Sequence, residues 1–271
     1  MTKGWDILVR TAPGLEGFLE EELRRMGIRG KAKRGEVRAR AGPRTIARIN
    51  YTSRIAHRVF IILWEGKVGG LNDIEKVSMQ PDYASIIPPS KTFAVRGART
   101  GKHNFTSVDI GRVVGASIIS RFKEDTGKRP RVNLGDPDIE VFAVLEDDRF
   151  RLLINTTGES LHKRYPKPYQ HPAPIKASIA AALLRAAGFR RGSRVMDPMV
   201  GGGTIVAEAA CMDMNRPPGF YRGFWMYENL IGFRRFRVDK EKGCKGDILG
   251  TDLFHKHVRG VKRNLLAAGI D

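Results

Sequence analysis

The chain has 271 residues, 41% of them hydrophobic, so it is long enough for two or three folded domains. Its 48 Lys and Arg against 29 Asp and Glu give a net charge of +19, which indicates a polyanionic partner, with nucleic acid ahead of a membrane surface. No apolar run approaches the length of a membrane span and the first residues lack the apolar core of a signal peptide. We therefore predict no membrane association and a cytoplasmic location.

Residues 1–67 alternate between strand and helix patterns. Apolar runs predict strands at 5–10, 36–40 and 59–65, and amphipathic spacing predicts helices at 14–26 and 43–56. This order is typical of a small ferredoxin-like β-α-β-β-α-β unit.

Residues 68–160 form a second predicted unit. It begins with a helix over 71–87 that stops at Pro88, followed by a strand over 92–96 and a loop. Thr106 and Asp109 give the signal that caps the start of a helix, and two strands follow at about 139–145 and 150–156. The Pro- and Lys-containing stretch 161–170 has the character of a linker.

The most informative motif is SRVMDPMVGGGTIVAEAA, at 193–210. It predicts a short strand stopped at Asp197-Pro198, a glycine turn at 201–203, and a helix that opens at Thr204. The unpaired N–H groups of such a helix start can hold a carboxylate or a phosphate. No Lys follows Gly203 as a P-loop requires, and GGGTIV does not supply the dinucleotide fingerprint. A glycine turn without a ligand remains the alternative at this point.

Two flanking segments support a ligand. His171 and Pro172 precede an amphipathic helix that we expect to start near Pro174 and to end before Gly188. Downstream, DILGTDLF predicts a strand ending in Asp252, where a ribose diol would be held, although Asp252 could also cap the next helix. His255 and His257 face different sides of that helix, so we predict no metal site. The isolated Cys211 and Cys244 are expected to be reduced thiols.

The D-P-x-x-G-x-G-T pattern resembles motif I of class I S-adenosylmethionine-dependent methyltransferases. FAVRGARTGKHNFTSVDIGRVVG and TGESLHKR resemble the RNA-binding THUMP domain, and the order of all segments resembles the THUMP-containing RNA guanine-N2 methyltransferases, closest to the archaeal tRNA type. The SGGxDS loop of the THUMP-containing thiouridine synthases is not in this sequence. The resemblance implies an α/β and α+β fold: a ferredoxin-like domain (1–67), a THUMP domain (68–160), a linker (161–170) and part of a Rossmann-like methyltransferase domain (171–271).

The resemblance also implies functions for particular residues. S-adenosylmethionine would be bound by His171, Pro172, Pro174, Asp197, Pro198, Gly201, Gly203, Thr204 and Asp252. The acceptor end of tRNA, or another structured RNA, would be bound by Arg96, Arg99, Lys102, His103 and Phe105. Any one of these cations could equally be an ordinary surface charge, and Phe105 could be a core anchor.

One family feature is missing. The family's [DN]-P-P-[YF] loop, which binds the target amine, does not occur, so no catalytic residue is assigned. Asn215–Phe220 (NRPPGF) is a near match that we interpret as a surface connection. We therefore expect a C-terminally truncated methyltransferase domain, unstable unless a second chain completes its sheet. The predicted function is methylation of guanine N2 in tRNA, and the alternative is a catalytically incomplete tRNA-binding protein.

Overall fold

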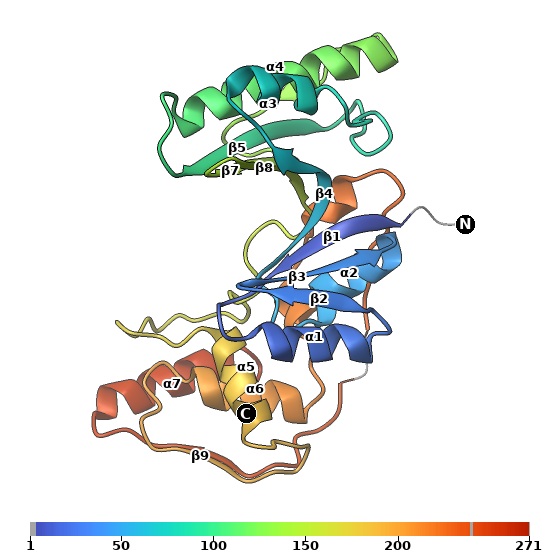
Figure 1. The fold of residues 1–271 in the computed structure, drawn as a ribbon. Coiled ribbons are helices and arrows are strands. Elements are labelled where there is room, and N and C mark those ends of the chain that lie inside the picture. The colour runs from blue at the N-terminus through green and yellow to red at the C-terminus, as the bar shows by residue number, and fades with distance from the viewer. Residues whose placement is uncertain (1–3, 239–240, 271) are drawn as a thin grey trace.

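The computed structural model describes residues 4–238 and 241–270, which form three groups of elements stacked along one axis (Figure 1). The first, ferredoxin-like group contains β1 (Trp5–Arg10), α1 (Glu16–Arg25), β2 (Gly30–Lys33), β3 (Glu36–Ala41), α2 (Pro43–Thr52) and β4 (Arg58–Lys67). The second group contains α3 (Leu71–Ser78), β5 (Thr92–Thr100), α4 (Ser107–Thr126), β6 (Arg131–Val132), β7 (Ile139–Glu146) and β8 (Arg149–Asn155). The third contains α5 (Ala177–Ala186), β9 (Val195–Asp197), α6 (Thr204–Asp213), the 3₁₀ turns η1 (Pro218–Tyr221) and η2 (Met226–Asn229), β10 (Ile248–Gly250) and α7 (His255–Ala267).

The first two groups share one eight-stranded sheet. Its order is β2-β3-β1-β4-β8-β7-β5-β6, and the long strand β4 pairs with β1 through its first half and with β8 along most of its length. The two units are therefore joined by a continuous hydrogen-bonded ladder, which limits their relative movement.

The four helices of these two groups pack on the same face of the sheet. Ile7, Ile61 and Ile154 lie opposite one another in register on neighbouring strands and belong to one buried cluster. The same cluster contains Leu23 of α1 and Ile118 of α4, so one core supports both units.

Several predicted boundaries were wrong. α3 ends at Ser78 instead of residue 87, because Pro81 disfavours helical backbone at the preceding residue. β5 continues to Thr100, where we predicted a loop after residue 96, because its parallel ladder with β7 extends to Glu146. Strand β2 was not predicted, and α2 ends at Thr52, four residues before the predicted end.

The third group holds a two-stranded parallel sheet, β9 beside β10, covered by α6 and α7. Helix α5 begins at Ala177, shortly after Pro174, near which we expected it to start. Gly188, with φ +73°, ends the helix as predicted. The strand side chains of Met196 and Leu249 are 63% and 52% exposed.

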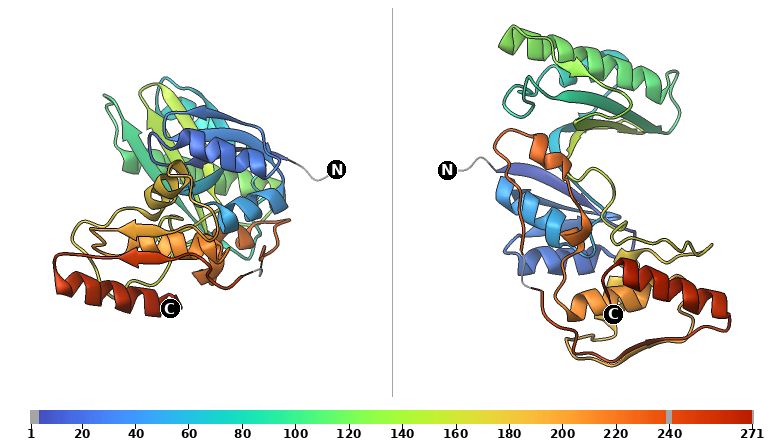
Figure 2. Two further views of the ribbon diagram at one scale, coloured as in Figure 1. Left: turned by 90° about the horizontal axis from the view of Figure 1, so that it is seen from below. Right: turned by 180° about the vertical axis from the view of Figure 1, so that it is seen from behind.

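Asn215–Phe220 is not the surface connection that we predicted, because Arg216, Pro218 and Gly219 are buried. It begins a longer segment, 215–238. Figure 2 shows this orange segment leaving the third group, running beside the ferredoxin-like helices toward the second group, and returning. Gly219 is buried, and a Cβ there would lie 2.6 Å from the Tyr51 ring of α2. Trp225 and Tyr227 are buried in the large core. The segment is thus a structural strap across all three groups.

None of the helices in the described part of the chain is both long enough and apolar enough to cross a lipid bilayer.

Candidate cofactor site and RNA-facing surface

The glycine turn lies at the carboxyl end of β9, as predicted. Gly201 and Gly203 have φ of +50° and +79°, a region that suits glycine. A Cβ at Gly203 would lie 2.8 Å from Val261 of α7, so close packing also demands glycine there. Asp197 is 8% exposed, and its Oδ1 accepts the Met199 N–H at 3.1 Å, which shapes the first half of the turn.

Asp252 joins the ends of the two parallel strands. Its Oδ2 accepts the N–H of Gly201 at 3.0 Å, and its Oδ1 accepts the N–H of Phe254 at 3.0 Å. These two backbone donors, followed by nearby His257, hold the pKa of the Asp252 carboxyl below its ordinary value. The N-cap of α7 is Phe254, so the alternative of Asp252 as the helix cap is wrong.

The side chains of two histidines, His171 and His257, pack beside this turn. The His171 ring packs edge-on against His257 with centroids 4.7 Å apart, and a Cβ at Gly202 would lie 3.2 Å from His171 Cβ. His257 Nδ1 lies 3.1 Å from Asp252 Oδ1. His171 therefore contacts the glycine turn, as the family resemblance implied, although it precedes the turn by a whole helix and a strand in the chain.

The amino terminus of α6 opens onto the same turn. Its N-cap is Gly203, which has no side chain to bond the first N–H groups. The Thr204 hydroxyl accepts from Lys167 Nζ at 3.1 Å, and burial lowers the pKa of that lysine. A partly buried cation and an uncapped helix start together favour a bound carboxylate.

The structure thus brings together most of the predicted cofactor residues. His171, Asp197, Gly201 and Asp252 meet at one edge of the small sheet, while Pro172, Pro174 and Pro198 lie exposed on the adjoining loops. Sequence reasoning missed Lys167 and gave no role to His257. Neither residue belongs to a local sequence motif that would indicate a ligand, because only the fold brings them to the turn.

The predicted RNA-binding residues lie on and after β5. Arg96 is on the strand, where Nε pairs with Glu140 at 3.0 Å, and Arg99 is on the strand as well. Lys102 is exposed in the loop. His103 and Phe105 have ring centroids 5.2 Å apart, and Phe105 packs against the large core. Lys102 and the half-buried His103–Phe105 pair remain accessible from solvent in the same loop.

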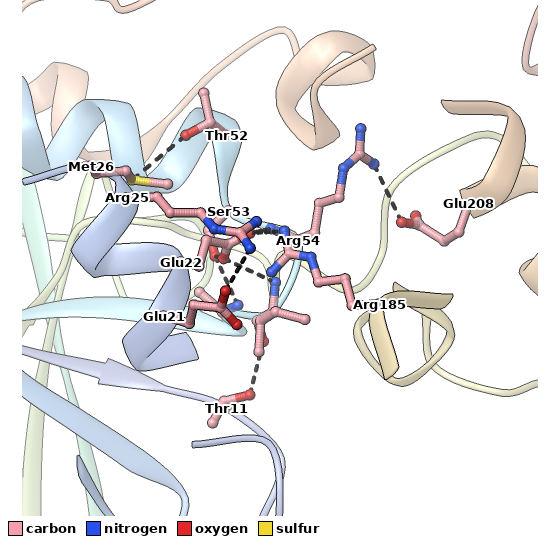
Figure 3. A network of polar contacts seen from close by, with 12 residues as sticks. Thr11, Glu21, Glu22, Arg25, Met26, Thr52, Ser53, Arg54, Arg185 and Glu208 are labelled. Carbon is pink, nitrogen blue, oxygen red and sulfur yellow. Dashed lines mark hydrogen bonds and ion pairs between the residues drawn. The ribbon is translucent and has the colours of Figure 1, made fainter. Parts of the chain in front are cut away.

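A buried ionic cluster joins the candidate cofactor unit to the ferredoxin-like unit. Glu208 of α6 is fully buried and binds Arg164 at 2.6 Å and Arg54 at 3.3 Å. Arg54 follows α2, and Figure 3 shows its side chain between the two units. A second pair, Glu22 with Arg185 at 2.7 Å, ties α1 to α5. These contacts fix the turn relative to the rest of the chain.

Family models match all three groups of elements. Residues 6–60 match the RlmL ferredoxin-like domain, residues 70–155 the THUMP domain, and residues 164–271 the RMKL-like methyltransferase domain. A tRNA (guanine(6)-N2)-methyltransferase of Methanocaldococcus jannaschii is 35% identical over 96% of this chain and 71% of its own length. The chain belongs to the THUMP-containing methyltransferase family.

A second member of this family, the tRNA (guanine(6)-N2)-methyltransferase of Archaeoglobus fulgidus, is also 35% identical, over 95% of this chain. The chain spans 65% of the length of that relative. Among solved structures, a predicted N6-adenine-specific DNA methylase from Listeria monocytogenes superposes with a TM-score of 0.87 at 26% identity, covering 99% of this chain and 73% of the other. The ferredoxin-like, THUMP and methyltransferase architecture is thereby confirmed.

Proposed function

We propose that this chain binds S-adenosylmethionine and takes part in methylating the exocyclic N2 of a guanine in tRNA, in the cytoplasm. The main observation behind this proposal is the glycine turn, which contacts Asp252 and His171 at the carboxyl ends of two parallel strands. Membership of the family, and the names of its two archaeal relatives, support the reaction and the substrate.

The residues at the turn fit S-adenosylmethionine. The uncapped start of α6 and the Lys167 ammonium suit its carboxylate. A carboxylate has about four acceptor positions. Gly201, Phe254 and His257 contact Asp252 at three of them, which leaves one for a ribose hydroxyl.

When bound, S-adenosylmethionine supplies an electrophilic methyl group, which passes to the guanine amine; the amine loses a proton and S-adenosylhomocysteine remains. The chain's own contribution is to hold the donor in a fixed pose, because the turn is braced by α7 at Gly203 and by Asp252 at Gly201. The guanine has to be swung out of its stack to reach this edge of the sheet. No residue of this chain is assigned as the acceptor of the amine proton.

The THUMP unit is proposed to hold the acceptor end of the RNA. Lys102 is exposed and would contact phosphate, and the half-buried His103 and Phe105 rings would stack on unpaired bases. Arg96 contributes less free charge, because Glu140 pairs with it. Replacement of Lys102 should therefore weaken RNA binding more than replacement of Arg96.

A second chain that completes the small sheet is part of the proposal. Among the described strands, β9 pairs with β10 alone, and Met196 and Leu249 expose apolar surface that parallel sheets normally bury. A polypeptide carrying the [DN]-P-P-[YF] loop should form a one-to-one complex with this chain on size exclusion. Separate elution of the two at micromolar concentration would contradict this part.

Calorimetric titration with S-adenosylmethionine tests the proposed cofactor. The intact chain should bind it, and Asp197→Ala should weaken binding roughly tenfold or more, because the turn loses the side-chain oxygen that accepts the Met199 N–H. Asp247→Ala is the matched control, since the Asp247 side chain is 73% exposed and pairs with Arg194 at 3.5 Å. Absence of binding by the intact chain, with tRNA affinity retained, would leave an RNA-binding protein without chemistry.

A further inference from the structure

The strap of residues 215–238 carries a cluster of arginines that the proposed function does not use. Its sequence FRRFR places Phe233 and Phe236 three residues apart. Phe233 is buried and stacks on Trp5 with centroids 5.4 Å apart, and Phe236 packs edge-on against Tyr51 at 6.0 Å. The two aromatic anchors hold the intervening and following arginines at the surface in a defined place.

These arginines line a cavity of about 640 Å³ at the amino end of α2. The lining residues are Gly42, Pro43, Arg44, Thr45, Gly232, Arg234, Arg235, Phe236 and Arg237. The set contains four guanidinium groups from two separate segments and no carboxylate. A cavity with this lining selects an anion.

Three of the four arginines are available to a ligand. Arg235 is engaged, because its Nε pairs with Glu228 at 3.1 Å and it also donates to the Gly223 carbonyl. Across residues 4–238 and 241–270, no ion pair joins Arg44, Arg234 or Arg237 to a carboxylate. Arg235 therefore fixes the strap, and the other three present charge to the cavity.

The start of α2 adds backbone donors to the same cavity. Its N-cap is Gly42 and its first residue is Pro43, and no side chain caps the helix. The N–H groups of Arg44 and Thr45 thus lack intrahelical partners and lie among the lining residues. Guanidinium forks together with helix N–H groups are the donor set that proteins use for phosphate.

We propose that this cavity binds backbone phosphates of the RNA substrate, as a second contact separate from the THUMP loop. The inference rests on the proposed function for the identity of the RNA. The strap lies between the RNA-facing and cofactor-bearing parts. Within it, Asn229 donates to the Asp138 carbonyl of the THUMP-like unit at 2.8 Å, and beyond it the Lys242 N–H donates to the Met214 carbonyl after α6 at 2.8 Å. A phosphate held here would fix the RNA between its gripped end and the glycine turn.

The test compares tRNA affinity over a range of salt for the intact protein and three variants. The double variant Arg234→Ala/Arg237→Ala removes two cavity cations of the strap, and Arg44→Ala removes the one that α2 contributes. The matched control is Arg24→Ala/Arg29→Ala: both arginines are exposed and flank Met26, which contacts Thr52 at the other end of α2. Fluorescence anisotropy with labelled tRNA gives each dissociation constant.

Removing one phosphate-binding cation should reduce the slope of log affinity against log salt by about 0.7–0.9 and weaken binding about five- to eightfold at roughly 0.1 M salt. We expect this change for Arg44→Ala, and about twice this change in slope for the strap variant, which removes two arginines. The effect should be the same on tRNAs of different sequence, and the affinity for S-adenosylmethionine should stay unchanged. A strap variant with the slope of the control would overturn the inference while leaving the proposed function intact. A reduced slope in a chain that binds no S-adenosylmethionine would support the phosphate site and contradict the proposed function.

Discussion

At the scale of single residues, Asp252 is the side chain that closes the candidate cofactor site. Asp252→Asn replaces an acceptor of two backbone N–H groups by an amide, one end of which donates. We expect S-adenosylmethionine affinity to fall about 10- to 100-fold, the usual effect of losing a charge-assisted hydrogen bond. Calorimetry measures this, with Asp247→Asn as the surface control.

The lowered pKa of Asp252 also sets a pH dependence. The carboxylate stays charged as the pH falls toward the ordinary aspartate range, so its contribution to binding is lost only below that range. Affinity of the intact protein should therefore be unaffected by this group between about pH 8 and pH 5. A loss of affinity near pH ~6 that Asp252→Asn abolishes would contradict the assignment.

His57 should make folding stability depend on pH. Its Nε2 lies 2.7 Å from Ser178 Oγ, and burial, followed by the neighbouring His162 and Lys176, lowers its pKa to about 4. The folded protein keeps His57 neutral while the unfolded chain takes up a proton below about pH 6.5, so stability is lost as the pH falls from about 6.5 to about 4. The slope from this group is at most about 1.4 kcal/mol per pH unit.

Urea unfolding at about pH 4.5 and pH 7 checks the effect. His57→Gln should narrow the difference in unfolding free energy between the two pH values, because it removes the titrating group. His255→Gln, at an exposed position at the start of α7, should leave the difference unchanged. Equal effects of the two variants would show that His57 is not the group responsible.

The candidate site shows which residues a sequence can reveal. Gly201 and Asp252 were predictable because each lies at or just after the end of a predicted strand, within a local motif. The turn needs a glycine backbone at Gly201, and an acidic side chain is expected at the position of Asp252. Lys167 and His257 were not, since each reaches the turn only through the packing of the linker and α7. Local signals therefore identified the groups that shape the turn and missed those that surround it.

At the scale of elements, glycines decide how closely helices approach their neighbours. A Cβ at Gly260 of α7 would lie 2.3 Å from the Tyr169 ring, whose backbone Asn264 holds by two hydrogen bonds. Gly115 of α4 is the matched control, a helical glycine with room for a methyl group, because a Cβ there would lie 3.8 Å from Val95. Alanine should raise stability by about 0.5–1 kcal/mol at Gly115 through helix propensity.

At Gly260 the steric overlap should outweigh the same gain in propensity. We expect Gly260→Ala to lower the free energy of unfolding by about 1–3 kcal/mol, as overpacking does in other cores. Urea unfolding of both variants measures the contrast. Stabilisation by both substitutions would mean that the linker can move away from α7 at little cost.

The elements that sequence analysis placed wrongly share a physical cause. Gly97 was interpreted as the start of a loop, yet it lies within β5, where a Cβ would meet the Ser107 carbonyl oxygen at 2.0 Å. Glycine there serves close helix approach and not a turn. Asn215–Phe220, the start of the strap, was likewise interpreted as a surface connection, because its burial comes from residues distant in sequence. A Cβ at Gly219 would lie 2.6 Å from the Tyr51 ring. Long amphipathic or capped elements such as α4, with the predicted Thr106–Asp109 capping box, were placed closely.

At the scale of the whole molecule, the buried cluster at Glu208 holds the cofactor unit against the ferredoxin-like unit (Figure 3). Glu208 is fully buried, and Arg164 and Arg54 are at most 10% exposed in their side chains. Removing the Glu208 charge would leave these two buried guanidinium groups without the carboxylate that pairs with them. Such a change usually costs about 3–5 kcal/mol.

We therefore expect Glu208→Gln to lower the free energy of unfolding of the joined units by about that amount. Urea unfolding and hydrogen exchange of the α6 amides measure the loss. Glu159→Gln is the matched control, because its pair with Lys163 is more than 60% exposed on both sides and should contribute about 0–1 kcal/mol. Glu208→Asp keeps the charge and should fall between the two. If Glu208→Gln were no more destabilising than Glu159→Gln, the two units would be held by their other contacts, among them the Glu22–Arg185 pair and the strap. The Glu208 cluster would then contribute nothing measurable to holding the glycine turn in place.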